Sequence, residues 1–167
     1  MNKTIYFTFL FIILVLLQVF ILDNILLFGY VNPYLYISFI FLYPLKENRF
    51  YFLFLAFLLG LSIDFFSDSG GIHAFATLFI GYLRLLLIKV IFKKSSFDYK
   101  LFSFKEEPFG KVFNYVTILT ITHHLLLFTF ANFSFINYGH VILQTILSSI
   151  FTLILFFLGN FIFRTKQ

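Results

Sequence analysis

The sequence predicts an all-α integral membrane protein, a six-transmembrane-helix bundle that forms one domain over residues 1–167. The first observation is composition, because 61% of the residues are hydrophobic and only 11% are charged, whereas soluble domains carry about 25% charged residues. The second is the length of the apolar runs, since a helix needs about 20 apolar residues to cross a bilayer. A soluble enzyme and a soluble nucleic-acid-binding protein are therefore excluded, and the absence of cysteine excludes a disulfide scaffold.

The apolar runs are continuous rather than alternating, which predicts helices and not a transmembrane β-barrel. They cover residues 5–22, 25–45, 50–66, 72–92, 112–133 and 141–163. The first run could be mistaken for a signal peptide, but it is long for one and no small-residue cleavage site follows it. We expect it to remain as a helix.

The second run is the least regular of the six. Gly29, Asn32 and Pro33 interrupt it near its start, and its strongly apolar part, residues 34–45, is short for a span. Residues 25–32 could therefore form a re-entrant or interfacial stretch that leads into a shorter helix.

The basic residues predict the orientation of the bundle. The loops 23–33, 67–71 and 134–140 contain no Lys or Arg, whereas five lysines lie in the loop 93–111. The positive-inside rule then places both termini and the loop 93–111 in the cytoplasm. Six spans also put Lys46 and Arg49 on that side, which supports the second span.

The Lys-rich loop 93–111 has two compatible interpretations. It is an orientation signal whose lysines bind anionic lipid, at about 1 kcal/mol for each basic residue near the surface. It could also be a docking site for a cytoplasmic partner.

Polar residues gather at the turn between the third and fourth predicted helices. Gly60, Asp64 and Asp68 are spaced by four residues and would form one stripe on a helix. Gly60 would let a neighbouring backbone approach closely, and Gly71 supplies the freedom that a tight turn needs before His73 begins the next helix. One interpretation is a helix-end cap with a polar turn. The other is a structured corner, with Asp64 held by backbone N–H groups or by His73, that forms part of a partner surface.

Arg84 lies in the second half of the fourth predicted helix. A pair with Asp64 would need a large vertical offset between the two helices. We expect the Arg84 side chain to extend toward the cytoplasmic face together with Lys89.

The fifth predicted helix carries a polar stripe, with His123 pointing about 100° away from it. The stripe consists of Asn114, Thr117, Thr120 and His124. Adjacent histidines do not share a helix face, and there is no cysteine, so the pattern predicts hydrogen bonds to neighbouring helices and no metal site.

Small polar residues mark a packing face on the last helix, in pairs spaced by four residues. These are Thr145 with Ser149 and Ser148 with Thr152, and Gln18 in the first helix is interpreted in the same way. No nucleophile motif, facing pair of intramembrane aspartates or phosphate-binding loop is present, so we expect no enzymatic activity and no cofactor.

Residues 60–84 resemble the signature region of the rod shape-determining protein MreD family. The stretch reads Gly60-Leu-Ser-Ile-Asp64-Phe-Phe-Ser-Asp-Ser-Gly-Gly71-Ile-His73-Ala, with Gly81-Tyr-Leu-Arg84 following it. In that family a Gly-x-x-x-Asp helix end leads through a Ser/Gly turn into a Gly-x-x-Ala helix start. The positions of Gln18 and Pro33, the chain length and the number of spans are similar as well.

The resemblance implies a non-enzymatic scaffold subunit of the bacterial cell-elongation complex, located in the inner membrane. Its implied partners are MreC and, through MreC, the MreB filament, RodA and a penicillin-binding protein; membrane lipid surrounds it, and nucleic acid is not expected. Gly60, Asp64, Gly71 and His73 carry over as a structured outer corner. The fold would be similar to the S component of energy-coupling-factor transporters, so the alternative is a substrate-binding subunit of a vitamin transporter, which would need an enclosed pocket with convergent polar groups.

Overall fold

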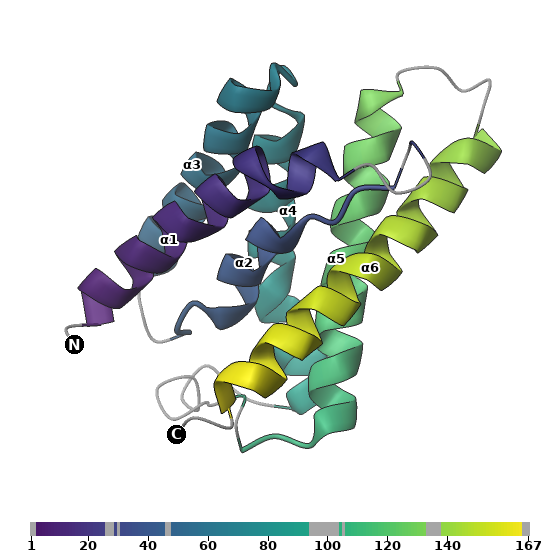
Figure 1. The fold of residues 1–167 in the computed structure, drawn as a ribbon. Helices are drawn as coiled ribbons and strands as arrows, with labels where there is room; N and C mark the ends of the chain where they lie inside the picture. The colour runs from purple at the N-terminus through teal and green to yellow at the C-terminus, as the bar shows by residue number, and fades with distance from the viewer. Residues whose placement is uncertain are drawn as a thin grey trace.

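A computed structural model describes residues 3–25, 29, 31–45, 48–93, 104, 106–132 and 138–164, and its regular elements within these ranges are helices (Figure 1). Five of them are long and apolar enough to cross a membrane, as expected of a multi-pass membrane protein. In chain order the elements are α1 (Lys3–Phe20), the short 3₁₀ turns η1 (Leu22–Asn24) and η2 (Leu35–Ile37), α2 (Ser38–Leu42), α3 (Arg49–Ser67), α4 (Ile72–Leu87), a π-helical turn η3 (Ile88–Phe92), α5 (Phe109–Ala131) and α6 (Tyr138–Arg164).

The predicted second span, residues 25–45, is wrong as a continuous helix. Its described part begins with the non-helical residues 31–34, and only η2 and the five-residue α2 follow. Pro33 cannot donate a backbone hydrogen bond, and Gly29 has a positive φ of 81°. The shorter helix that the sequence suggested after residue 33 is present as η2 and α2, whereas residues 26–28 and 30 of the expected re-entrant or interfacial stretch 25–32 lie outside the described part of the chain.

The segment 31–45 nevertheless runs the length of the bundle. Figure 1 shows it descending from the end of the molecule where α1 finishes to the end where α3 starts. The start of α1 and the end of α6 therefore lie at the same end of the bundle. We call the opposite end, which holds the turn between α3 and α4, the corner end.

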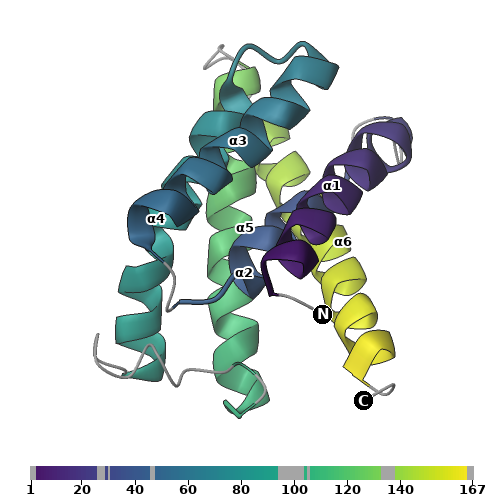
Figure 2. The ribbon, with the colours of Figure 1, turned by 90° about the vertical axis from the view of Figure 1, so that its left-hand side faces the viewer.

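Consecutive long helices pack against each other, α3 on α4, α4 on α5 and α5 on α6, and α1 packs on α3. Figure 2 shows α2 in the middle of the molecule, with both α1 and α6 to its right. Four residues of η2 and α2, namely Tyr36, Ile37, Phe39 and Ile40, are at most 1% exposed. The segment with the least helix thus supplies the centre of the core.

The backbone of this central segment is paired with side chains from the surrounding helices. The N–H of Asn32 donates to Ser148 Oγ at 3.3 Å, and the N–H of Tyr34 donates to Thr152 Oγ1 at 3.0 Å. Gln18 Nε2 donates to the Pro33 carbonyl oxygen at 2.9 Å. An unpaired backbone group in hydrocarbon costs several kcal/mol, so these side chains make the non-helical stretch possible.

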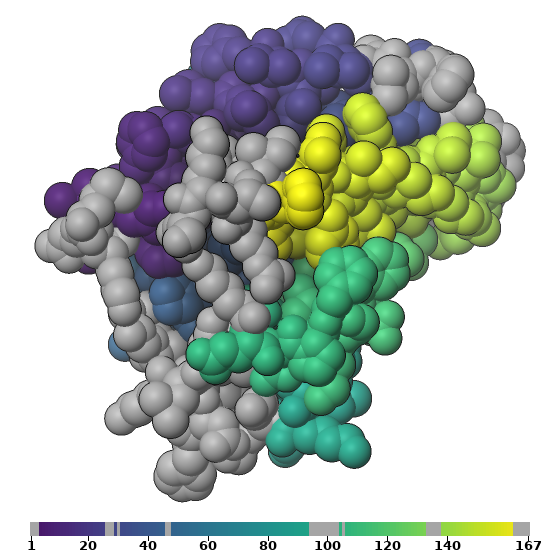
Figure 3. Space-filling view, turned by 60° about the horizontal axis from the view of Figure 1, so that its bottom comes forward, coloured from purple at the N-terminus to yellow at the C-terminus, as the bar shows by residue number. Residues whose placement is uncertain are grey.

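The pairs Thr145/Ser149 and Ser148/Thr152 are buried, so the packing face predicted on the last helix is confirmed. At the end opposite the corner, Phe109 and Phe113 of α5 each lie 5.5 Å from Phe157 of α6 between ring centroids. Figure 3 views that end and shows the last turns of α6 against the first turns of α5. Large apolar side chains cover the outer faces of the long helices, where lipid would surround them.

Candidate functional site

The corner begins with the contact of Gly60 on α4. A Cβ atom built on Gly60 would lie 2.4 Å from the His73 carbonyl oxygen and 2.5 Å from Ala74 Cα. Any side chain at this position would collide with backbone atoms. The close helix approach expected from the sequence is therefore confirmed.

Asp64 lies one turn further along α3 and caps the start of α4. Its Oδ1 accepts the N–H of His73 at 3.0 Å, and its Oδ2 accepts the N–H of Ala74 at 2.7 Å. The first N–H groups of a helix have no partner within the helix, and the N-cap residue Gly71 has no side chain to offer them. Asp64 supplies the missing acceptor from the neighbouring helix, at the positive end of the α4 dipole.

Two side chains complete the pairing of Asp64, which is only 5% exposed. Ser69 Oγ donates to Asp64 Oδ1 at 2.5 Å, and His73 Nδ1 lies 3.0 Å from the same oxygen. Because an ionised carboxylate only accepts, His73 Nδ1 carries a hydrogen and donates it. Both holders of Asp64 that the sequence suggested, backbone N–H groups and His73, are present together. Arg84 takes no part, as expected.

The predicted stripe of Gly60, Asp64 and Asp68 is wrong at its last member. The helix ends at Ser67, and Asp68 takes a left-handed conformation with φ 50° and a backbone N–H bonded to the Asp64 carbonyl oxygen. This change of conformation breaks the helical periodicity, so the Asp68 side chain is exposed while Asp64 is buried. No described residue donates to the Asp68 carboxylate. Gly71 has a φ of 94°, which explains why the turn needs glycine there.

A third carboxylate, that of Asp23, joins the corner to α1. Gln18 Nε2 donates to Asp23 Oδ1 at 2.8 Å, and Asn32 Nδ2 donates to the same atom at 3.3 Å. Ser67 Oγ, at the end of α3, donates to Asp23 Oδ2 at 3.3 Å. Asp23 therefore links the ends of α1 and α3 with the start of the central segment.

Below the corner, tyrosine and histidine side chains fill the core. The Tyr34 ring lies 5.7 Å from the ring of His73 and 5.2 Å from the ring of His124, between centroids. The Tyr36 hydroxyl lies 2.8 Å from His123 Nε2. On α4, Thr77 Oγ1 donates to the His73 carbonyl oxygen at 2.6 Å. The central segment is thus connected to α4 and α5 through polar aromatic side chains.

The pairing of His124 fixes its tautomer. His124 Nδ1 lies 2.7 Å from the Thr120 carbonyl oxygen, which can only accept, so Nδ1 carries the hydrogen. His124 Nε2 then accepts from the Thr152 hydroxyl at 3.2 Å. Because the Thr152 oxygen also accepts the N–H of Tyr34, one threonine joins α5, α6 and the central segment.

The polar stripe predicted on α5 reaches the core only in part. Thr120 and His124 are buried, but Thr117 is half-buried and Asn114 is exposed. His123, expected to point away from the stripe, is fully buried as well. The reason is that α5 packs between α4 and α6, so its buried arc is wide enough for both histidines. Among the described residues, no group of three or more His, Asp or Glu could hold a metal ion.

Tyr34 and Tyr36 were not predicted as site residues. Both stand in an apolar run of a chain in which 24% of the residues are aromatic, so neither differs from its neighbours by type. The one available signal is their position directly after Pro33, where a regular helix is not expected.

The expected extension of Arg84 toward the cytoplasmic face is wrong. Its side chain is 1% exposed, Nη2 donates to the Tyr43 carbonyl oxygen, and the guanidinium lies 4.8 Å from the Phe52 ring centroid. α2 ends at Leu42, so the carbonyl groups at its end need donors from elsewhere. A buried guanidinium that meets this need over an aromatic face does not have to reach water.

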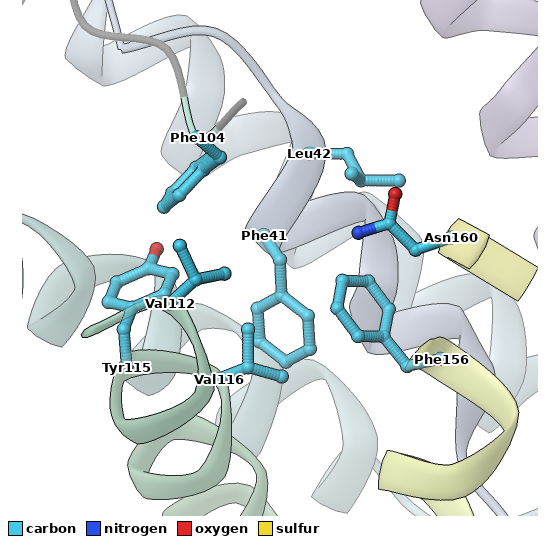
Figure 4. Close-up of a pocket in the computed structure, with 8 residues that line it drawn as sticks. All are labelled: Phe41, Leu42, Phe104, Val112, Tyr115, Val116, Phe156 and Asn160. Carbon is cyan, nitrogen blue, oxygen red and sulfur yellow. The ribbon is translucent and has the colours of Figure 1, made fainter. Parts of the chain in front are cut away.

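A small cavity lies at the end of the bundle opposite the corner. It has a volume of about 30 Å³, and its lining is almost wholly apolar. Figure 4 shows the side chains of Phe41, Val116 and Phe156 converging on it from α2, α5 and α6. Pockets for small molecules usually measure about 300–1,000 Å³ and carry several polar groups, so this cavity does not fit a vitamin.

Most of the predicted cytoplasmic loop 93–111 lies outside the described residues, namely 94–103 and 105, and so does Lys46. Phe104 is described and packs on the bundle, 5.9 Å from Phe92 and 5.2 Å from Tyr115 between ring centroids. One point of the loop therefore contacts the end of η3 and the first part of α5.

Comparison of the chain with protein-family models, with curated proteins and with solved structures gives no match. A functional proposal for this chain therefore rests on the contacts of its described residues and on the resemblance of residues 60–84 to a known family.

Proposed function

We propose that the chain is a non-enzymatic scaffold subunit of the bacterial cell-elongation complex, which binds MreC in the inner membrane with both termini in the cytoplasm. The observation that supports this most is the corner. Gly60, Asp64, Gly71 and His73 are the positions that the likeness to the MreD family carries over, and in this chain they form one continuous unit. A shared motif whose residues form a single structural unit supports a family resemblance better than shared apolar helices do, because apolar helices resemble one another in unrelated membrane proteins.

The polar interior also supports a scaffold. Asp23, Asp64, His124 and Thr152 are taken up by hydrogen bonds within the chain, while the outward faces of the long helices are apolar. The surface of such a protein consists mainly of apolar helix faces, which are available for packing against a partner helix. In lipid, helices associate through close packing and a few hydrogen bonds. MreC would bind in this way, and MreB, RodA and the penicillin-binding protein would join through it.

The alternative, a vitamin-binding transporter subunit, has less support. It needs an enclosed polar pocket, and the cavity beside Phe41 is about 30 Å³ in volume and almost wholly apolar. The polar side chains nearest the corner are already bonded to one another. These contacts favour a protein partner over a small ligand.

The test is to tag the chain, express it with MreC from the same organism and solubilise the membranes in mild detergent. We expect MreC to co-elute, and we expect depletion of the chain to convert rod-shaped cells into rounded ones that the wild-type chain restores. If MreC does not co-elute and cell shape is unchanged, the proposal is wrong. Stabilisation of the purified chain by a vitamin would support the alternative instead.

Variants of Gly60 or Asp64 are unsuitable for this binding test. Both residues hold α3 against α4, so their replacement changes the stability of the fold as well as any partner surface. Binding is better probed at exposed positions.

A further inference from the structure

The corner ends in an exposed apolar and acidic surface, formed by Phe65, Phe66 and Asp68, which we call the outer tip. Phe65 is 81% exposed and Phe66 is 55% exposed, and their rings meet edge to face with centroids 5.5 Å apart. Asp68 lies two residues after Phe66, beyond the last turn of α3. The outer tip therefore presents two exposed aromatic rings in the last turn of α3 and an exposed carboxylate directly after that helix.

Asp68 differs from the other two carboxylates at this end of the molecule. Asp23 accepts hydrogen bonds from Gln18, Asn32 and Ser67, and Asp64 accepts four from the start of α4 and its turn. No described residue donates to the Asp68 carboxylate. Its backbone is nevertheless fixed, because the N–H groups of Asp68 and Ser69 both donate to the Asp64 carbonyl oxygen. Because the backbone at Asp68 is already ordered, a partner that binds this carboxylate has only the Asp68 side chain to order.

The charge around the outer tip is of one sign. The loops 23–33, 67–71 and 134–140 contain no Lys or Arg, and none lies between Arg49 and Arg84. Figure 1 shows the α3–α4 turn at the same end of the bundle as the finish of α5 and the start of α6. No basic residue near Asp68 in the sequence offsets its negative charge. A cationic protein segment is its natural complement.

We propose that the outer tip docks the point where a partner's single transmembrane helix leaves the membrane, on the side of the α3–α4 turn. Apolar side chains at the end of that helix pack on Phe65 and Phe66, and a Lys or Arg directly beyond them pairs with Asp68. This inference rests on the proposed function, because it says where the partner of the scaffold binds. The contacts inside the corner then have a purpose, since they hold the outer tip in place.

The test uses the full chain, whose lack of cysteine allows one label site. Ile142→Cys places a donor dye on α6 at the same end, on a side chain that is 48% exposed and outside the outer tip. The labelled protein is placed in zwitterionic vesicles with acceptor-labelled apolar peptides that span the bilayer. One peptide ends in three lysines and the other in three glutamates, while the far end is neutral in both. We expect the lysine peptide to associate about tenfold more tightly, and this preference to shrink as salt is raised.

Three variants separate the contribution of the Asp68 charge to peptide binding from that of the exposed aromatic rings. Asp68→Asn removes the charge while Asn still tolerates the left-handed conformation, so most of the lysine preference should vanish. Phe65→Ala should weaken both peptides. Phe50→Ala is the matched control, because Phe50 is 83% exposed on the same helix but at its other end, and it should change neither affinity.

Equal affinity for the two peptides would mean apolar adhesion alone and would overturn the proposal. An unchanged lysine preference in Asp68→Asn would do the same, as would equal effects of Phe65→Ala and Phe50→Ala. If MreC still co-elutes with the wild-type chain after such a result, the proposed docking site is wrong but the proposed function is not. If the peptide preferences hold but MreC never co-elutes, the docking site is supported and the proposed function is wrong.

Discussion

Gly60 of α3 lies directly against the backbone of His73 in α4, so closely that a Cβ at position 60 would be 2.4 Å from the His73 carbonyl oxygen. One turn later, Asp64 of the same helix accepts the N–H of His73. The two helices are thus held by a steric contact with His73 from Gly60 and by a hydrogen bond from His73 to Asp64. Each contact can be removed separately.

The steric contact predicts that Gly60→Ala destabilises the protein. The added methyl group meets backbone atoms that cannot rotate away, so we expect a loss of about 1–3 kcal/mol in the free energy of unfolding. Gly159→Ala is the control, because Gly159 lies in α6 and its Cβ would meet nothing within 4 Å. Thermal unfolding followed by size-exclusion chromatography measures both. Equal melting temperatures for the two variants would contradict the prediction.

The polar contact predicts a large effect of Asp64→Ala. The N–H groups of His73 and Ala74 lose their acceptor at the start of α4, so we expect a loss of about 3 kcal/mol and faster hydrogen exchange at both amides. Asp64→Asn keeps a carbonyl acceptor and should cost less. Asp68→Asn should be nearly neutral, since no described residue bonds that carboxylate. A neutral Asp64→Ala variant would show that the cap does not matter.

Replacing the acceptors of the central segment should destabilise the core. Ser148→Ala and Thr152→Ala leave the N–H groups of Asn32 and Tyr34 unpaired, and a buried unpaired N–H costs about 1–3 kcal/mol. Thr145→Ala is the control, since its hydroxyl is buried in the same helix but bonds only to the Val141 carbonyl oxygen. The comparison is again made by thermal unfolding. A Thr145→Ala variant as unstable as the other two would argue against a special role for these acceptors.

The position of Arg84 predicts its chemical accessibility. In the cysteine-free chain, Arg84→Cys should react with a water-soluble maleimide roughly tenfold or more slowly than Lys89→Cys, because Arg84 is buried and Lys89 is exposed. Labelling rates in native membranes measure this. Similar rates at the two positions would restore the view that Arg84 extends to the aqueous face.

The long helices were predictable because apolar content and length suffice to define a span. The run 50–66 became α3 (Arg49–Ser67), and the run 72–92 became α4 with η3, ending at Phe92. The central segment was not predictable in this way, because apolar content fixes depth in the membrane but not conformation. Its shape depends on Ser148 and Thr152, and nothing in the local sequence points to such distant partners.

The candidate site was predictable in its residues but not in their directions. The spacing of Gly60 and Asp64 indicated one helix face, and both do face α4. Asp68 has the same spacing, yet a left-handed residue at the helix end turns it outward. His123 is buried because of how α5 packs, which depends on the arrangement of the whole bundle rather than on the pattern of one helix.

The hydrogen bonds from Asn32 and Tyr34 to α6 join residues that are 116 and 118 positions apart in the chain. A ribosome delivers the central segment long before the last helix, so for most of synthesis its N–H groups lack their final partners. The central segment therefore reaches its final hydrogen bonding only when α6 is in place, late in synthesis.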